Sequence, residues 1–168
     1  MRWSKTLLSL AERNQMILEY AKVRETAYAP SRANPSDAGL DIFYSPQNPH
    51  NKMYIATTSS RIIPTGLKFA IPHGYMLEVK NRSSVAATRQ LIVGACVIDS
   101  GYEGEVFVNL HNIGVESQTL KPGDKIAQLV MTPVVHFRPV ETAEENLYTY
   151  PMTISSRGEG ALGSTNGR

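Results

Sequence analysis

The chain has 168 residues, of which 42% are hydrophobic. This length supplies one ordinary domain with its own core and is too short for two. Lysine and arginine number 17 against 15 aspartate and glutamate residues, so the balanced charge provides no broad electrostatic attraction to nucleic acid. We therefore expect no direct nucleic-acid binding, and any anionic ligand must be bound by a local site.

The single cysteine, Cys96, cannot form an intrachain disulfide, which is typical of a reducing compartment. No apolar run approaches the roughly 20 residues that a membrane-spanning helix needs, and the apolar stretch near the N-terminus is too short for a signal peptide. We therefore expect a cytoplasmic protein, or a nuclear one in a eukaryotic or viral setting. We expect it not to be secreted and to have no membrane partner.

Three regions differ in sequence pattern. Residues 1–15 form an N-terminal extension, in which residues 4–15 contain good helix formers but are too few for a stable isolated helix. In residues 16–154, short β-like runs are separated by Pro, Gly, Asn and Ser at close intervals, a pattern typical of an all-β sandwich or barrel. Residues 155–168 are rich in glycine and poor in apolar side chains, which predicts a flexible C-terminal arm.

Alternating apolar and polar residues predict individual strands. Residues 67–71 and 75–79 both alternate and are joined by the turn sequence Pro72-His73-Gly74, which predicts a hairpin. In residues 106–110 the two valines and the leucine share one face. The turn sequence at 121–124, Lys-Pro-Gly-Asp, leads into a further predicted strand.

The stretch ACVIDSGYEGEVF, residues 95–107, places an acid, Asp99, at the end of an apolar strand. A carboxylate in that position is costly to desolvate unless it has partners or a function. The local sequence leaves two interpretations open. Asp99 either caps backbone amides in an Asp-Ser-Gly turn or acts as a general base at the end of a strand.

Three other segments carry groups that suit phosphate. NRSSVAA, residues 81–87, offers a guanidinium, two hydroxyls and the amides of small residues, or it is an ordinary serine-rich turn that opens a short helix. Gln128 lies at the centre of a predicted strand and faces either a ligand or solvent. RGEGALGST, residues 157–165, combines glycines with Arg157 but lacks the spacing of a Walker-type site, and its alternative is a disordered tail.

Taken in order, five segments resemble the five motifs of the trimeric dUTP diphosphatase (dUTPase) family. They are SDAGLDIFYS at 36–45, NRSSVAA at 81–87, VGACVIDSGYEGE at 93–105, GDKIAQLV at 123–130 and RGEGALGST at 157–165. The resemblance implies an all-β, jelly-roll-like distorted β-barrel with at most one or two short helices. It also implies a homotrimer whose three active sites are each assembled from more than one subunit.

The resemblance further implies hydrolysis of dUTP to dUMP and pyrophosphate. Asp99 would activate the water that attacks the α-phosphorus. Tyr102 would lie against the deoxyribose and exclude a 2′-hydroxyl, and the backbone of Cys96, Val97 and Ile98 would hydrogen-bond the uracil edge. The other substrate-binding positions implied are Arg82, Ser83, Ser84 and Gln128 for the phosphates, and Arg157, Leu162, Gly163 and Ser164 in the arm that closes over the substrate.

The cofactor implied by the resemblance is Mg²⁺, held mostly by phosphate oxygens and waters. Asp41 either acts on it indirectly, through a water, or organises the first motif. Some positions depart from the family pattern, notably Leu162, which stands where a phenylalanine usually covers the uracil. Leucine lacks a flat stacking face, so we expect closure of the arm to be weaker by about 1 kcal/mol. Other departures are Asn81 for proline, Ser84 and Cys96 for glycine, and Gly101 for an acid.

The sequence leaves two alternatives to dUTP hydrolysis. The dCTP deaminases share the fold, but their chemistry relies on a glutamate where this chain has Asn109, and an amide cannot shuttle the proton. A dUTPase-like nucleotide-sensing or protein-binding module with weak catalysis is favoured by Leu162 and by the N-terminal extension. The presence of Asp99, Tyr102, Arg82 and Arg157 together favours the enzyme.

Overall fold

The structure is a computed structural model that describes residues 16–149. The chain divides into two units, residues 1–135 and 136–168. The second unit contains the short 3-10 helix η1 (Glu144–Asn146). The elements of the first unit, in chain order, are β1 (Glu19–Lys22), β2 (Leu40–Phe43), β3 (Met53–Ile55), β4 (Ser60–Pro64), β5 (Leu67–Ala70), β6 (Tyr75–Lys80), α2 (Ser83–Arg89), β7 (Leu91–Val93), β8 (Val97–Ile98), β9 (Phe107–Asn112), β10 (Gln118–Leu120) and β11 (Lys125–Pro133).

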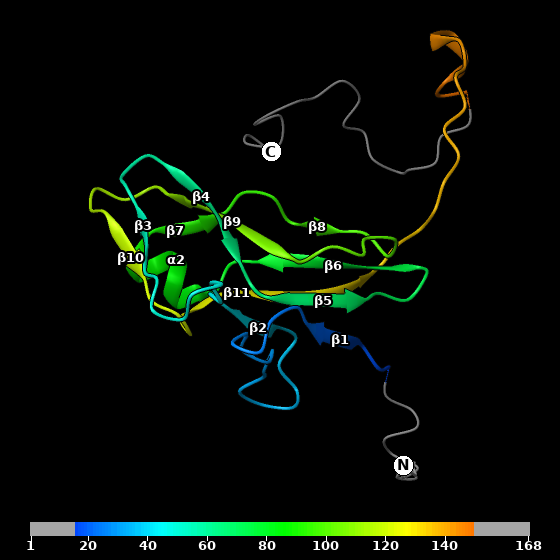
Figure 1. Ribbon diagram of the computed structural model, residues 1–168. Helices are drawn as coiled ribbons and strands as arrows, with labels where there is room; N and C mark the ends of the chain where they lie inside the picture. The colour runs from blue at the N-terminus through cyan, green and yellow to red at the C-terminus, as the bar shows by residue number, and fades with distance from the viewer. Residues whose placement is uncertain (1–15, 150–168) are drawn as a thin grey trace, which may run out of the picture. The chain divides into compact units, whose positions relative to one another are not determined.

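The strands pair into four antiparallel sheets (Figure 1), in the orders β2-β11-β6-β8, β4-β9-β7, β1-β5 and β10-β3. The predicted all-β class, with one short α-helix in the described residues, is confirmed. The helix expected within residues 4–15 and the arm at 155–168 lie outside the described residues, and the domain boundaries proposed from the sequence remain predictions.

One hydrophobic core collects the inward side chains of these sheets and of α2. The predicted alternation in residues 106–110 is confirmed, because Val106, Val108 and Leu110 are buried while Phe107 is exposed. Burying a side chain of this size contributes about 1.5–3 kcal/mol to folding, so the alternation in each strand fixes which face turns inward.

The hairpin predicted over residues 67–79 is wrong, although both strands and the turn between them exist. β5 pairs with β1, whereas β6 pairs with β11 and β8, so the turn carries the chain from one sheet to another. The backbone N–H of Tyr75 donates to the C=O of Pro72 at 3.1 Å to close that turn. Alternating apolar and polar residues indicate only that one face of a strand is buried. Two consecutive strands show the same pattern whether they pair with each other or belong to different sheets.

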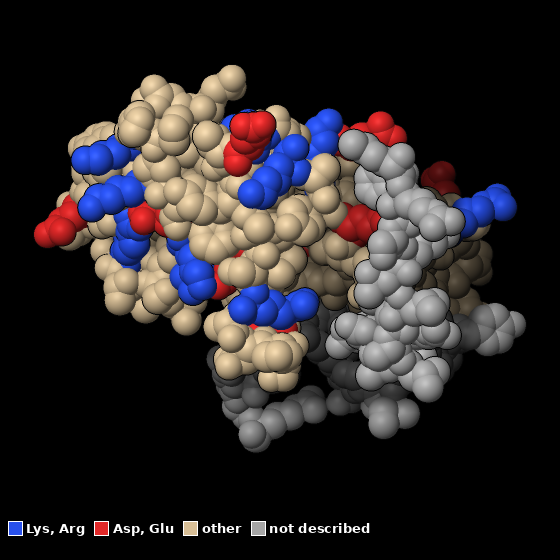
Figure 2. Space-filling view, turned by 60° about the horizontal axis from the view of Figure 1, so that its bottom comes forward, with Lys and Arg blue, Asp and Glu red and all other residues tan. Residues whose placement is uncertain are grey.

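The surface carries both signs of charge close together. On the face drawn in Figure 2, acidic side chains lie among the lysines and arginines, and no continuous basic stripe crosses that face. Within residues 16–149 there is no helix of the length and hydropathy needed to cross a membrane.

Two glycines with positive φ provide a test of the packing. Gly66 has φ +71° and a Cβ added there would lie 2.5 Å from the Cβ of Ala27, whereas Gly74 has φ +86° and open space around it. We expect Gly74→Ala to lower the free energy of unfolding by about 1–2 kcal/mol through backbone strain alone. Gly66→Ala should cost about 1–3 kcal/mol more, because overpacking adds to the strain. Urea denaturation measures both, and equal losses would contradict the packing described for Gly66.

Candidate active site

The first cluster of candidate residues lies where β6 ends and α2 begins. Arg82 is the N-cap residue of α2, with extended backbone angles (φ −87°, ψ 132°) and no side-chain capping bond. Ser83 and Ser84 follow in the first turn and are exposed. The segment 81–87 therefore does form a serine-rich opening to a short helix, and that geometry also leaves the guanidinium and both hydroxyls outside the core.

Strand register brings three distant motifs to this point. In β11, Gln128 is the direct partner of Asp41 in β2 on one side and of Lys80 in β6 on the other. A cavity of about 340 Å³ lies beside them and is lined by Ala33, Asp37, Ala38, Gly39, Asp41, Arg82, Ser83 and Gln128. A smaller neighbouring cavity of about 210 Å³ includes Arg82 and Ser84. We call the residues Asp41, Arg82, Ser83, Ser84 and Gln128 the polar cluster.

The carboxylate of Asp41 is the electrostatic centre of the polar cluster. The Asp41 side chain is 11% exposed, and its Oδ1 accepts a hydrogen bond from Nε of Arg82 at 2.7 Å. Nζ of Lys125 lies 2.8 Å from Oδ2. Each oxygen therefore faces a cation, and the three groups together carry a net positive charge. Lys125 was not identified from the sequence, because nothing local distinguishes it from a solvent-exposed lysine.

The Gln128 amide is positioned by the backbone around it. Its Nε2 donates to the C=O of Asn81 at 2.8 Å. A Cβ at Gly39 would lie 1.7 Å from its Oε1, so only glycine leaves room for the amide there. The side chain of Asn81 accepts a hydrogen bond through Oδ1 from the N–H of Val93 at 2.7 Å.

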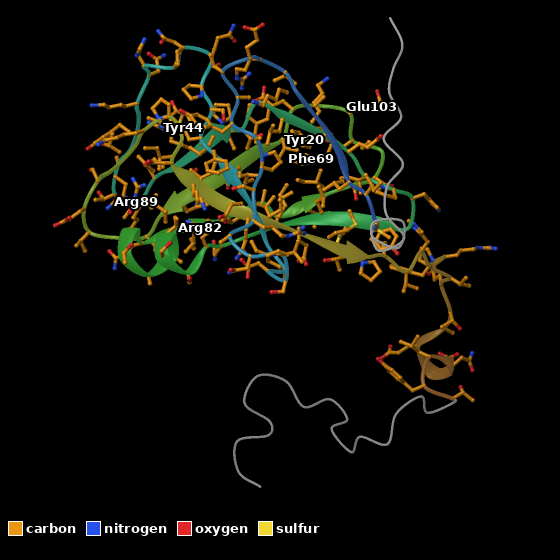
Figure 3. All side chains as sticks on the ribbon, turned by 90° about the horizontal axis from the view of Figure 1, so that it is seen from below. Tyr20, Tyr44, Phe69, Arg82, Arg89 and Glu103 are labelled. Atoms are coloured by element: carbon orange, nitrogen blue, oxygen red, sulfur yellow. The ribbon has the colours of Figure 1, made fainter. Side chains whose placement is uncertain are left out.

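A second arginine fastens α2 to the turn before β11. Arg89 is the last residue of α2 and is labelled in Figure 3 together with Arg82, which immediately precedes the helix. Arg89 donates to Asp124 Oδ2 at 3.0 Å and to the C=O of Thr119 at 2.6 Å. Asp124 begins the segment that leads to Gln128, so Arg89 fixes the helix relative to that strand. Nothing in the local sequence singles out Arg89, because its partners lie far away along the chain.

The second cluster of candidate residues lies around the loop after β8. Val97, Ile98, Asp99 and Tyr102 line a cavity of about 210 Å³ together with Val106 and Phe107. The turn is closed by the N–H of Tyr102, which donates to the C=O of Asp99 at 3.1 Å. The exposed Asp99 carboxylate makes no hydrogen bond to any residue in the described range 16–149, so the bonds expected of a capping side chain are not seen there. We call Cys96, Val97, Ile98, Asp99 and Tyr102 the edge cluster.

The backbone of β8 has one open side. The N–H of Val79 in β6 donates to the C=O of Cys96 at 2.7 Å, so Cys96 faces β6. Backbone groups alternate in direction along an antiparallel strand, which turns Ile98 toward β6 as well and Val97 away from it. Because β8 is the last strand of its sheet, the N–H and C=O of Val97 point to the open edge.

The two clusters lie far apart within one chain. Ile98 pairs with Leu77, so Asp99 lies about four residues along β6 from Lys80 and two strands across from Gln128. Strand geometry converts this to about 13 Å along the sheet and about 10 Å across it, or on the order of 16 Å in all. Figure 3 agrees, since Glu103, just after the Asp99 turn, lies well away from Arg82.

An ion pair occupies the sheet between the clusters. Nζ of Lys80 donates to Oε1 of Glu78 at 2.7 Å, and Thr132 Oγ1 donates to the other oxygen at 3.2 Å. The hydrogen bond from Lys80 lowers the pKa of Glu78, and the same contact raises the pKa of Lys80. Both side chains stay charged at neutral pH, so this part of the face carries no net charge.

Four of the residues named from the sequence, Arg157, Leu162, Gly163 and Ser164, lie outside the described residues. The described range 16–149 also contains no group of three or more His, Cys, Asp or Glu side chains arranged to hold a metal ion. With both oxygens of Asp41 facing cations, direct coordination of a metal by this residue does not fit the cluster.

Sequence comparison agrees with this arrangement. The dUTPase family model matches residues 25–162. The chain is 37% identical over 142 residues to a deoxyuridine 5'-triphosphate nucleotidohydrolase of Anaplasma marginale, which covers 81% of this chain and 87% of that protein. It is 33% identical over 148 residues to one of Chlamydia trachomatis, covering 87% and 96%. The chain belongs to the dUTPase family.

Solved structures show the same fold. The dUTPase of Staphylococcus bacteriophage 80alpha with dUpNHpp superposes with a TM-score of 0.74 at 24% identity, covering 90% of this chain and 99% of that chain. The dUTPase of phage phi11 of S. aureus gives a TM-score of 0.67 at 25% identity, covering 77% and 99%. The jelly-roll-like fold expected from the sequence is thereby confirmed.

The charge arrangement at Asp41 predicts a stability change. Asp41→Asn removes the carboxylate from between Arg82 and Lys125 and leaves two cations side by side. We expect the free energy of unfolding to fall by about 1–3 kcal/mol, because partly buried charges lose their partner. Asp37→Asn is the matched control, since among the described residues Asp37 accepts hydrogen bonds only from the neighbouring Asn34, through its backbone N–H and its side-chain amide, in an exposed loop. Urea denaturation compares the two, and an unchanged Asp41→Asn midpoint would contradict the central place given to Asp41.

Proposed function

We propose that this protein hydrolyses dUTP to dUMP and pyrophosphate. Family membership and the names of its relatives support this activity. The observation in the structure that carries most weight is the polar cluster, where the Arg82 guanidinium, the Ser83 hydroxyl and the Gln128 amide line one cavity and the Ser84 hydroxyl lines its neighbour. The group formed by Asp41, Arg82 and Lys125 adds one net positive charge beside them. Such donors bind phosphate oxygens, with arginine giving the strongest and most directional contacts.

In this proposal Asp99 is the general base. Its carboxylate is exposed at the end of β8, so it can accept a proton from a water aimed at the α-phosphorus of the substrate. The outward N–H and C=O of Val97 would pair with the uracil edge, where cytosine presents the opposite donor pattern. The Tyr102 ring would lie against the deoxyribose. Ser83, Ser84, Arg82 and Gln128 would hold the phosphates.

We propose Mg²⁺ as the cofactor, carried by the triphosphate and waters. This suits an ion that dehydrates reluctantly and binds through few protein carboxylates. A dUTPase of phage phi11 has been described with a structural Mg(II) ion. In this chain Asp41 would orient Arg82 toward the phosphates, and any contact of Asp41 with the ion would pass through a water. Bound to the phosphates, the ion would neutralise their charge.

We further propose that the enzyme is a homotrimer with shared active sites. A base must lie within about 3.5 Å of its water, and the water equally close to phosphorus. The separation of about 16 Å between Asp99 and Gln128, estimated from strand spacings, is too large for one chain to supply both. The edge cluster of one subunit would therefore meet the polar cluster of another. Residues 157–164 would close the site, with Leu162 over the uracil.

The alternative functions have weaker support. Asn109, at the position of the deaminase glutamate, lies with its Oδ1 2.7 Å from Nε2 of His111 and offers no carboxylate. A nucleotide-sensing or protein-binding module would bind dUTP through the same clusters without turnover, so measurement of product decides between it and the enzyme.

The role of Asp99 predicts a large loss of rate. Asp99→Asn keeps the shape of the side chain but cannot take up a proton, so kcat for dUTP should fall by about 10²–10⁴-fold. The affinity for the nonhydrolysable analogue dUpNHpp should stay within about threefold, because the phosphate contacts are intact. Pyrophosphate release with Mg²⁺ and calorimetric titration measure the two quantities. Equal, negligible release from the unmodified protein and the variant would establish the binding module instead.

Shared sites predict recovery of activity on mixing subunits. Asp99→Asn and Gln128→Ala should each be nearly inactive alone, since one lacks the base and the other a phosphate contact. After denaturation together and refolding in equal amounts, about a quarter of the sites in a randomly mixed trimer would combine two unmodified clusters. We expect pyrophosphate release to recover toward that fraction. Refolded single variants are the control, and no recovery would show that each site comes from one chain.

A further inference from the structure

The Tyr102 ring is supported from behind by the backbone of residues 104 and 105. Its Oη donates to the C=O of Glu105 at 2.8 Å. A Cβ on Gly104 would lie 2.4 Å from Oη and 2.6 Å from Cζ, so the ring packs directly against the Gly104 backbone. Because the ring is otherwise 45% exposed, its position follows the position of the Glu105 backbone.

The side chain of Glu105, the last residue of the third motif, is held by an ion pair with Arg24, which lies outside all five motifs. Arg24 donates through Nη1 to Oε2 at 3.1 Å and through Nη2 to Oε1, and the N–H of Gly66 donates to the same Oε1 at 2.8 Å. Nε of Arg24 donates to the C=O of Ser45 at 3.1 Å. The side chains of Arg24 and Glu105 are only 17% and 16% exposed, so water competes little with this two-pronged contact.

The pair joins four separate segments at one point. Arg24 follows β1, Ser45 follows β2, Gly66 lies between β4 and β5, and Glu105 comes just before β9. The next residue is also fixed, since the N–H of Val106 donates to the C=O of Leu67 at 2.8 Å. The chain is therefore anchored from residue 105 onward, while residues 99–103 in front of it form an exposed turn.

We propose that the Arg24–Glu105 ion pair sets the distance of the Tyr102 ring from the sugar, and thereby determines how strongly the enzyme prefers deoxyribose to ribose. This inference rests on the proposed dUTP hydrolysis. Arg24 and Glu105 are positioning residues, because neither lines the cavity of the edge cluster and both act through Tyr102. A ring that moves back by a fraction of an ångström leaves space for a 2′-hydroxyl.

The test compares kcat/KM for dUTP and for UTP in Glu105→Gln and in Arg24→Lys. Glu105→Gln keeps an acceptor for the N–H of Gly66 but loses the negative charge. Arg24→Lys keeps the positive charge but loses the two parallel hydrogen bonds of the guanidinium to Glu105. We expect the dUTP-to-UTP ratio to fall on the order of tenfold in each, mainly because UTP is used better. Both substrates are measured on the same preparation, so the fraction of folded enzyme cancels from the ratio.

A destabilised variant far from the pair gives the control. Ile55→Val shortens a fully buried side chain in β3 and should lower stability without changing the ratio. If Glu105→Gln and Arg24→Lys also leave the ratio unchanged, the pair is merely structural and the inference is wrong. If the unmodified enzyme hydrolyses dUTP and UTP equally well, the proposed role of Tyr102 fails first and the inference fails with it.

Removal of the Tyr102 hydroxyl gives an independent test that does not depend on the folding of Glu105→Gln or Arg24→Lys. Tyr102→Phe breaks the bond to the C=O of Glu105 and keeps the ring, so it should shift the ratio in the same direction. Combined with Glu105→Gln, it should change the ratio by less than the product of the single effects, because both act on one ring. Fully multiplicative effects would overturn the proposed path through Tyr102.

Discussion

The pairing of β11 with β2 on one side and β6 on the other is the constraint on which the polar cluster depends. It places Gln128 between Asp41 and Lys80, and the Asp41 carboxylate then draws Arg82 and Lys125 toward the same point. A slip of one residue in this register would turn Gln128 to the other face and remove it from the cavity. The strand register of this sheet therefore brings residues from three motifs together.

Much of the fold followed from the sequence because alternation reports burial directly. It identified the inward faces of residues 67–79 and 106–110 correctly. It failed on the partners of β5 and β6, because strands in different sheets that cover one core leave the same pattern as a hairpin. Pairing depends on contacts between residues far apart in the chain, which a local pattern does not encode.

The residues of the candidate site also fall into those that the sequence could identify and those that it could not. Arg82, Ser83 and Gln128 stood out because their side chains suit phosphate, and the structure places them around one cavity. Lys125, Arg89 and Arg24 did not stand out, since the value of each lies in a partner elsewhere in the chain. Even the recognised Arg82 meets Asp41 across 41 positions of sequence. The local sequence shows which side chains can bind phosphate. Which oppositely charged residue each of them contacts depends on the fold.

The shortness of β8 has a consequence for solubility. A sheet edge with unsatisfied amides is a template for pairing with other chains, and proteins usually block such edges with charges, bulges or covering loops. Here the exposed edge is only two residues long, Val97–Ile98, and the chain turns away immediately after it. An edge this short offers too few backbone hydrogen bonds to recruit a foreign strand. If it also pairs with one planar base as proposed, ligand recognition and resistance to aggregation come from the same short strand.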